Sequence, residues 1–278
     1  MRETMPTPNE TAVARLGSCE RTSPLAKSGR RVFAGDHERV LLNSELQEIK
    51  AFTEKGLDPP SFEKAGPRAE LFFEPSATTC GIVTCGGLCP GLNNVIRALV
   101  LTAHHGYGVK RILGFRYGYQ GMSSNSTCDP FELTPDGVDH IHEQGGTMLG
   151  SSRGPQDEGD MVTTLRKHGV DILFVIGGDG TLRGGSELSK EIAKQGVPIS
   201  VIGIPKTIDN QDGTDDSGNV KLNDIGVFLR ESISEGFKAK GMACSIKYID
   251  PSYTIRSLPA CGIDATGQPE RMKTESDS

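Results

Sequence analysis

The segment 172–181 (ILFVIGGDGT) most constrains the fold, because a run of apolar residues leads directly into a turn of glycines. Five apolar residues without alternation are typical of a strand covered on both faces, as in a parallel sheet. Gly177, Gly178 and Gly180 lack side chains, so backbone N–H groups can approach an anion there. Asp179 adds carboxylate oxygens that suit a magnesium ion bridging phosphates. Taken alone, the segment also fits an ordinary strand-to-helix turn with an acidic tip.

A second glycine turn follows a second predicted strand. Residues 80–85 (CGIVTC) form a short strand, and residues 86–93 (GGLCPGLN) lead into a segment whose apolar residues recur at helical spacing. Pro90 suits a helix start, where its missing N–H costs nothing. The free N–H groups and the dipole at the N-terminus of this helix favour a phosphate. Two such turns in one sheet can converge at its carboxyl edge, where open α/β sheets bind ligands.

A lysine, a hydroxyl and a carboxylate follow a third predicted strand, within residues 202–210 (IGIPKTIDN). Phosphoryl transfer needs these groups: Lys206 can neutralise charge on the transferred group and Thr207 can hydrogen-bond it. Asp209 can accept the proton of an attacking hydroxyl. The same residues also fit a turn in which Asp209 caps the next segment and Lys206 is solvated.

The sequence contains four motifs: GGLCPGLN at residues 86–93, LGSSRG at 149–154, GGDGT at 177–181 and PKTIDN at 205–210. In their residues, order and spacing these motifs resemble the phosphofructokinase family. Residues 248–257 (YIDPSYTIRS) are similar to a motif of its long ATP-dependent branch, found in plants and protists. The resemblance covers residues 38–259 with one large interruption. We therefore expect an α/β fold: a three-layer, Rossmann-like parallel sheet with helices on both faces.

The resemblance implies a donor site for the phosphates of ATP, formed by Gly87, Arg153, Gly154, Gly178, Asp179, Gly180 and Thr181. Asp179 would hold Mg²⁺, and Lys206 would stabilise the transferred phosphate. In pyrophosphate-using relatives an aspartate follows the magnesium aspartate, and its bulk and charge would exclude the α-phosphate of ATP. Gly180 leaves that space open, which favours ATP. Lys206 occurs in both the pyrophosphate-using and the long ATP-using enzymes, so it does not distinguish the two donors.

The resemblance also implies an acceptor site for fructose 6-phosphate, formed by Thr207, Ile208, Asp209, Tyr253 and Arg256. Asp209 would accept the proton, while Tyr253 and Arg256 would hold the 6-phosphate; the planar guanidinium of arginine suits phosphate oxygens. The family reaction is ATP-dependent phosphorylation of fructose 6-phosphate to fructose 1,6-bisphosphate in glycolysis. The resemblance also implies a cytoplasmic, allosterically regulated enzyme that forms homo-oligomers.

The sequence departs from the family after Asn210. Gln211 follows where the family has a second aspartate, and residues 216–226 resemble a segment that lies far downstream in the family. The intervening methionine-glycine-arginine motif and acceptor-binding glutamate are absent. We infer an internally deleted and C-terminally shortened form whose second domain is largely missing. The predicted organisation is a disordered leader (1–37), a nucleotide-binding domain (38–210), a second-domain remnant (211–260) and a polar tail (261–278).

Composition narrows the function classes. The net charge of −6 argues against a nucleic-acid surface, and the lack of a long apolar run predicts no membrane span. Seven cysteines in a chain of this size indicate reduced cytosol rather than a disulfide framework. Cys80, Cys85 and Cys89 lack metal-ligand spacing. Acidic residues in the leader disfavour a plastid transit peptide.

Three further helical segments are predicted from apolar spacing. Residues 161–168 and 182–195 flank the central strand, and Gly196 is placed to end the second helix in a left-handed cap. Apolar residues within 40–52 approximate a helical stripe, for which we expect packing or subunit contact.

Two alternative functions stay open on the sequence. A nucleotide kinase of the NAD kinase type also uses a GGDGT turn, although the motifs at 86–93 and 205–210 disfavour it. A catalytically silent ATP-binding or regulatory subunit is favoured by the deletion.

Overall fold

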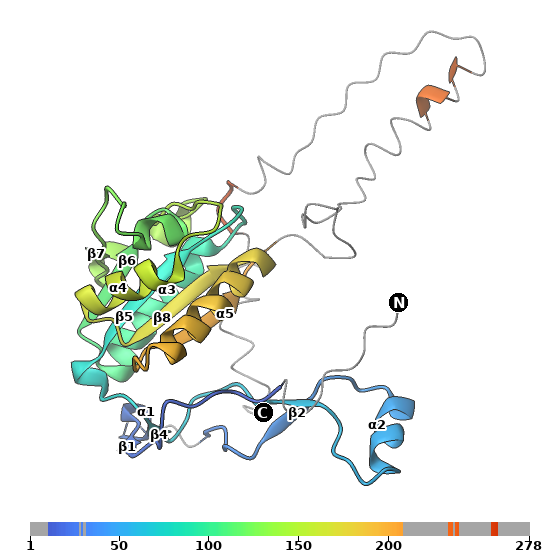
Figure 1. Cartoon of the computed structure of the whole chain (residues 1–278). Helices are drawn as coiled ribbons and strands as arrows, with labels where there is room; N and C mark the ends of the chain where they lie inside the picture. Colours follow the sequence, from blue (N-terminus) through green and yellow to red (C-terminus); the bar gives the residue numbers. More distant parts are fainter. Residues whose placement is uncertain are drawn as a thin grey trace. The chain divides into compact units, whose positions relative to one another are not determined.

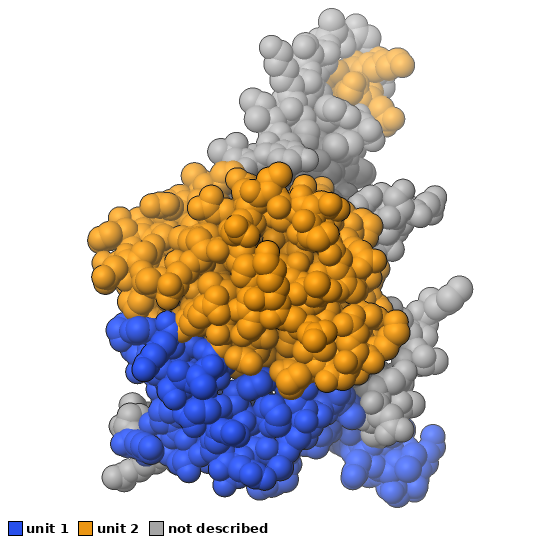
Figure 2. All heavy atoms as spheres, turned by 60° about the vertical axis from the view of Figure 1, so that its left-hand side comes forward, with its two compact units in different colours: residues 1–78, 102–110 blue, residues 79–101, 111–278 orange. Residues whose placement is uncertain are grey.

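The computed structural model describes residues 11–27, 29, 32–207, 233–235, 237–238 and 257–260, and the chain divides into two compact units (Figure 2). Unit 1 comprises residues 1–78 and 102–110, and unit 2 comprises residues 79–101 and 111–278. The nucleotide-binding domain was predicted to begin at residue 38, whereas its compact unit begins at Thr79. Strands between these positions pair with each other (39–41 with 61–63) or with residues 21–22, and not with the five-stranded sheet, which explains the later boundary.

The described part of unit 2 is built on a five-stranded sheet in the order β7-β6-β5-β8-β9. The strands are β5 (Thr79–Thr84), β6 (Arg111–Phe115), β7 (Phe131–Glu132), β8 (Ile172–Gly177) and β9 (Ser200–Pro205). β6, β5, β8 and β9 are parallel, as predicted, but β7 pairs antiparallel with β6. One 3-10 turn (Gly118–Met122), rather than a crossover helix, lies between β6 and β7, so the chain can return antiparallel.

Helices cover both faces of this sheet (Figure 1). They are α3 (Leu92–Leu101), α4 (Glu158–His168) and α5 (Asp179–Lys194). The crossover β5–α3–β6 and the crossover β8–α5–β9 run in opposite directions along the sheet. Right-handed crossovers therefore place α3 and α5 on opposite faces, which confirms the three-layer prediction.

The burial pattern of the strands matches these two layers. On one face, Val83 and Leu173 join a buried cluster with Leu165 of α4 and Leu188 of α5. The neighbouring Ile82 is also buried but lies outside that cluster. Successive strand residues point to opposite faces, so both faces of the central strands are covered. This explains why β5 and β8 are near-continuous apolar runs in the sequence.

Polar residues begin two of the helices earlier than apolar spacing predicted. α4 begins at Glu158 rather than at residue 161, because Asp157 caps it and accepts a hydrogen bond from the Asp160 N–H at 2.7 Å. α5 begins at Asp179 rather than at residue 182, so the GGDGT turn is itself the start of the helix. Gly196 follows α5 with a φ of 64°, which confirms the predicted left-handed position.

Unit 1 consists of short elements. β1 (Arg21–Thr22) pairs antiparallel with β4 (Glu70–Leu71), and β2 (Arg39–Leu41) pairs antiparallel with β3 (Ser61–Glu63). The helical elements of the unit are α1 (Pro24–Lys27), α2 (Leu46–Thr53), a 3-10 turn (Pro75–Ala77) and a π-helical turn (Thr102–Tyr107).

Two predictions for unit 1 need correction. The leader predicted to be disordered over residues 1–37 contains β1 and α1, because backbone hydrogen bonds to residues 70–71 order it there. The helical stripe predicted over residues 40–52 begins in β2, and α2 buries none of its residues. The first residues of that predicted helix instead form a strand, because they pair with β3.

The second-domain remnant and the tail lie mostly outside the described residues, which include only 233–235, 237–238 and 257–260 of this region. Within the described chain, no helix combines the length and the apolar character needed to cross a membrane.

Candidate functional site

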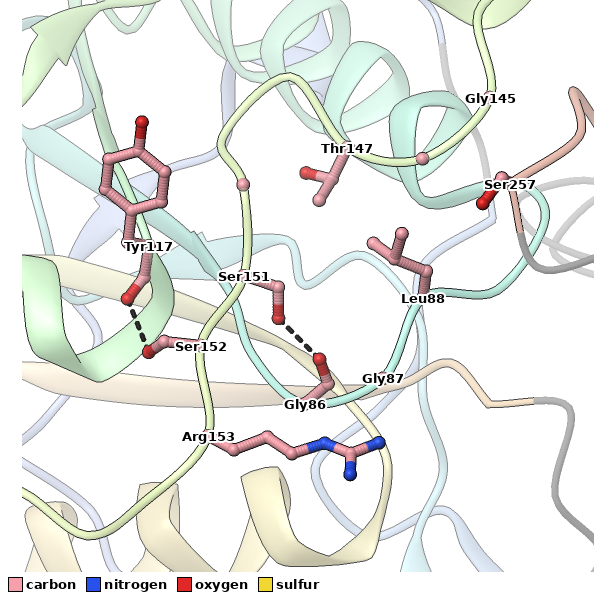
Figure 3. A pocket seen from close by; sticks show the side chains of 12 residues that line it. Gly86, Gly87, Leu88, Tyr117, Gly145, Thr147, Ser151, Ser152, Arg153 and Ser257 are labelled. Carbon is pink, nitrogen blue, oxygen red and sulfur yellow. Dashed lines mark hydrogen bonds between the residues drawn. The ribbon is translucent and has the colours of Figure 1, made fainter. Parts of the chain in front are cut away.

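A pocket with a volume of about 790 Å³ lies where the chain leaves β5 (Figure 3). Its walls come from four segments and one aromatic residue. The lining residues are Gly86, Gly87 and Leu88; Gly145, Gly146 and Thr147; Gly150, Ser151, Ser152 and Arg153; Ser257; and Tyr117. Glycines form much of this lining, so backbone groups are accessible to a ligand.

Hydrogen bonds join the first glycine turn to the loop of the LGSSRG motif. The Gly86 N–H donates to the Ser152 carbonyl at 3.1 Å, and the Ser151 hydroxyl donates to the Gly86 carbonyl at 2.6 Å. The Arg153 side chain extends alongside Gly86 and Gly87 (Figure 3). Gly154 follows with a φ of 105°, a conformation that favours glycine. The structure thus brings Gly87 next to Arg153, which lies 66 residues later in the sequence and is followed directly by Gly154.

Two buried side chains hold the adjoining glycine loop in place. The Thr84 hydroxyl, at the end of β5, lies 2.7 Å from the Gly150 carbonyl and 3.0 Å from the Thr147 hydroxyl. The Asn93 side chain accepts from the Met148 N–H at 2.8 Å and donates to the Gln144 carbonyl at 3.1 Å.

Sequence reasoning missed the Gly145, Gly146 and Thr147 wall of the pocket. The glycine pair just before the LGSSRG motif is a turn signal and could have indicated it. Tyr117 also lines the pocket, and its backbone has a φ of 59°. Local sequence carries no signal for that placement, because a tyrosine is uncommon at such a φ.

The N-terminus of α5 forms the second predicted phosphate segment. Thr181 is buried, and its hydroxyl lies 3.1 Å from the position that a Cβ on Gly86 would occupy. The GGDGT turn is therefore next to the first glycine turn. Asp179 and Gly180 are exposed, and a Cβ on Gly180 would meet no atom within 4 Å.

Lys206 and Thr207 extend from β9 to the same edge. The Lys206 N–H donates to the Gly177 carbonyl at 2.9 Å. Its Nζ lies 3.6 Å from the position of a Cβ on Gly91, just before α3 begins. Thr207 Oγ1 lies 3.5 Å from the equivalent position on Gly178. The remaining predicted acceptor residues, Ile208, Asp209, Tyr253 and Arg256, lie outside the described residues.

The charges at this edge suit an anion with a bound cation. Arg153 and Lys206 supply positive charge, and the N-termini of α3 and α5 add the positive ends of two helix dipoles. Asp179 supplies a single exposed carboxylate, and no group of three potential metal ligands occurs among the described residues. Mg²⁺ binds through one or two carboxylates plus substrate phosphates, so these residues fit a magnesium–nucleotide complex.

Fold and site together define a Rossmann-like α/β protein in which two glycine turns, two helix N-termini and two basic side chains meet at one sheet edge. The Phosphofructokinase family model matches residues 79–217. An ATP-dependent 6-phosphofructokinase from Amycolatopsis methanolica is 36% identical over 376 residues, covering 92% of this chain and 82% of that enzyme. The chain therefore belongs to the phosphofructokinase family.

Two further comparisons show how much of a relative this chain spans. An ATP-dependent 6-phosphofructokinase from Trypanosoma brucei brucei is 46% identical over 206 residues, which cover 73% of this chain and 42% of that enzyme. The crystal structure of Pichia pastoris phosphofructokinase in the T-state aligns with a TM-score of 0.44 and 25% identity, over 68% of this chain and 21% of that one. The chain thus spans less than half of both.

The Amycolatopsis match is longer than this chain, because 376 aligned residues exceed the 278 present. The alignment must therefore contain gaps in this chain. Gaps of this kind are what an internal deletion produces.

The buried thiols of Cys80 and Cys85 should be unreactive in the folded protein. Burial raises the pKa of both Cys80 and Cys85 to about 12, so at pH 8 only on the order of 1 in 10,000 of each thiol is the reactive thiolate. We expect iodoacetamide at pH 8 to label Cys128, which is partly exposed, long before Cys80 or Cys85. Peptide mass spectrometry measures this, with urea-unfolded protein as the control. Labelling of Cys85 in folded protein as fast as Cys128 would contradict it.

Proposed function

We propose that this chain binds Mg²⁺–ATP at the described pocket and that its reaction is transfer of the γ-phosphoryl group to fructose 6-phosphate. The observation that carries the proposal is the meeting of both glycine turns, Arg153 and Lys206 at one sheet edge. Relatives named ATP-dependent 6-phosphofructokinase support the choice of donor and acceptor. The product is fructose 1,6-bisphosphate, and the process is glycolysis.

On this proposal, backbone groups bind most of the donor. Gly87 and Gly154 offer N–H groups without side-chain obstruction, and Arg153 adds a guanidinium that can hydrogen-bond two phosphate oxygens. Residues 178–181 enclose the phosphates at the N-terminus of α5. Asp179 holds Mg²⁺, which neutralises charge on the phosphates when bound.

The acceptor side begins where β9 ends. Lys206 lies close enough to both glycine turns to stabilise charge on the transferred group. Asp209 accepts the proton from the 1-hydroxyl, with Thr207 and Ile208 beside the sugar. Tyr253 and Arg256 hold the 6-phosphate, as the resemblance to the family implies.

The wider setting follows the family. We propose a cytoplasmic enzyme that forms homo-oligomers and is regulated allosterically. The support is the family match and the buried cysteines, whose reduced state suits the cytosol.

A second candidate is a catalytically silent ATP-binding or regulatory subunit. The gaps in the match to the Amycolatopsis enzyme favour it, because part of that enzyme has no counterpart in this chain. A chain of this kind retains the donor pocket and lacks part of the acceptor pocket. An NAD kinase-type activity gains no support from the relatives named above.

The magnesium assignment is tested by Asp179→Asn. Loss of the charge should weaken Mg²⁺-dependent ATP binding by about 10-fold to 100-fold, the range seen when even the partners of metal ligands are removed. Titration calorimetry with and without Mg²⁺ measures this. Glu187→Gln is the matched control, because Glu187 is an exposed carboxylate further along α5 that pairs with Lys190. Equal affinity and equal magnesium dependence in wild type and Asp179→Asn would exclude Asp179 as the ligand.

Donor choice is tested by Gly180→Asp. The space around Gly180 is open, so the protein should tolerate the side chain, while its bulk and charge repel the α-phosphate. We expect ATP affinity to fall at least about 10-fold, which is 1.4 kcal/mol, while pyrophosphate affinity falls less. Gly180→Ala is the control for size without charge. An unchanged ratio of ATP to pyrophosphate affinity in Gly180→Asp would refute the role of this glycine.

Turnover of this chain should be very low even though ATP binds. Positioning supplies much of the catalysis in phosphoryl transfer, worth roughly 7–11 kcal/mol in well-oriented intramolecular reactions. Loss of part of the acceptor pocket should therefore reduce the rate by orders of magnitude. The measurement is a coupled assay with fructose 6-phosphate, Mg²⁺ and ATP, beside calorimetry of ATP binding.

Asp209→Asn is the control for a contaminating kinase in this assay. Turnover that is fast and abolished by this substitution would disprove the prediction and show a completed acceptor site. Absence of both ATP binding and turnover would count against the proposed function and against the silent subunit.

A further inference from the structure

Tyr119 connects a neighbouring loop to the start of α5. It lies in a 3-10 turn (Gly118–Met122) after β6, and its side chain is buried, with 9% of the residue surface exposed. Its hydroxyl donates a hydrogen bond to the Thr181 carbonyl at 2.7 Å. Thr181 is the last residue of the GGDGT turn, so this contact acts directly on a phosphate-binding segment.

Two adjacent glycines of α5 make room for the tyrosine ring. A Cβ on Gly184 would lie 2.7 Å from Tyr119 Cε2, and a Cβ on Gly185 would lie 3.4 Å from the Tyr119 hydroxyl oxygen. Glycine is a poor helix former, so a pair of glycines inside α5 costs helix stability. The close approach of the Tyr119 ring is a physical reason for glycine at both positions.

Residues 117–122 also contact the end of β5, just before the first glycine turn, and the loop that carries Arg153. The Tyr119 N–H hydrogen-bonds the Cys85 thiol, just before the first glycine turn. The Tyr117 N–H donates to the Leu149 carbonyl at 2.8 Å, and the Tyr117 carbonyl accepts from the Ser152 hydroxyl at 2.6 Å (Figure 3). Residues 117–122 therefore hold the start of α5, the end of β5 and the Arg153 loop relative to one another.

We propose that Tyr119 is a positioning residue for nucleotide binding, which holds the first turn of α5 in register with the first glycine turn and the Arg153 loop. This inference rests on the proposed function for its ligand. It adds a residue that the sequence motifs do not include and that need not touch the nucleotide.

The Tyr119 hydroxyl keeps its proton, and so remains a hydrogen-bond donor, at neutral pH. Burial raises the pKa of the Tyr119 hydroxyl well above its usual range, so the group stays protonated and can donate. Preorganised groups bind a ligand more tightly because the ordering cost is already met in the free protein. Loss of the hydroxyl should therefore appear as weaker ATP binding and as a looser first turn of α5.

The test compares Tyr119→Phe with Ile192→Val. Tyr119→Phe keeps the ring and removes the donor, whereas Ile192→Val makes a small cavity in the buried cluster at the far end of α5. We expect the Kd for Mg²⁺–ATP to rise roughly 3-fold to 10-fold in Tyr119→Phe, the size of one net hydrogen bond, and to stay unchanged in Ile192→Val.

Hydrogen exchange of the nucleotide-free protein gives a second measurement that does not depend on ATP binding. In Tyr119→Phe, amide exchange should accelerate in residues 180–184 and stay unchanged in residues 190–194. In Ile192→Val, the pattern should be the reverse. A merely structural role of Tyr119 would accelerate exchange along the whole of α5.

Gly184→Ala tests the ring contact from the other side. Alanine is the better helix former, so helix propensity alone predicts a more stable protein and unchanged binding. The added methyl group instead displaces the Tyr119 ring, and we expect the Kd for Mg²⁺–ATP to rise as in Tyr119→Phe.

The outcomes separate this inference from the proposed function. Unchanged Kd and unchanged local exchange in Tyr119→Phe, or uniform acceleration along α5, would overturn the positioning role. If wild-type protein does not bind ATP, the proposed function fails, and so does Tyr119 as a nucleotide-positioning residue. Local acceleration at residues 180–184 would then show only that Tyr119 orders the turn.

Discussion

The parallel pairing of β5 with β8 is the constraint on which the site depends. Thr84 lies opposite Ile176, and the Cys85 N–H continues the ladder by donating to the Ile176 carbonyl at 3.0 Å. Both strands therefore end at the same edge, and their glycine turns become neighbours. A slip of one residue would turn every strand side chain to the other face and leave apolar residues in place of Thr84 at the pocket. The buried core thus fixes the relative position of the two glycine turns.

Local sequence was sufficient for the central part of this arrangement. β5, β8 and β9 are short apolar runs followed by turn residues, and α3 has apolar residues at helical spacing, so their types and approximate positions were predictable. The N-terminal ends of α4 and α5 could not be predicted in this way, because the spacing of apolar residues gives no information about a first turn made of polar residues. In α5 those first residues are Asp179 and Gly180, where the glycine turn and the helix are one structure.

Long-range hydrogen bonds account for what sequence could not predict. Thr84 and Asn93 hold the loop around Thr147, more than 50 residues away, and Tyr119 holds Thr181 across 62 residues. None of these residues carries a local signal for its partner. In unit 1, pairing with β3 replaced the start of a predicted helix by a strand, because cross-strand hydrogen bonds outweigh a weak helical stripe.

The donor and acceptor halves of the site depend on different parts of the chain. The hydrogen bonds described for the pocket all join residues between 84 and 206, so its geometry is set by the sheet and its crossovers. On the proposed function, contacts to a sugar phosphate would come from residues that follow Lys206. Binding energy gained at the phosphates of a donor can order the nucleotide, but it accelerates transfer only when an acceptor hydroxyl is held in line with it. Donor affinity and phosphoryl transfer are therefore separable properties of this fold, and a change after Lys206 can remove the second while leaving the first.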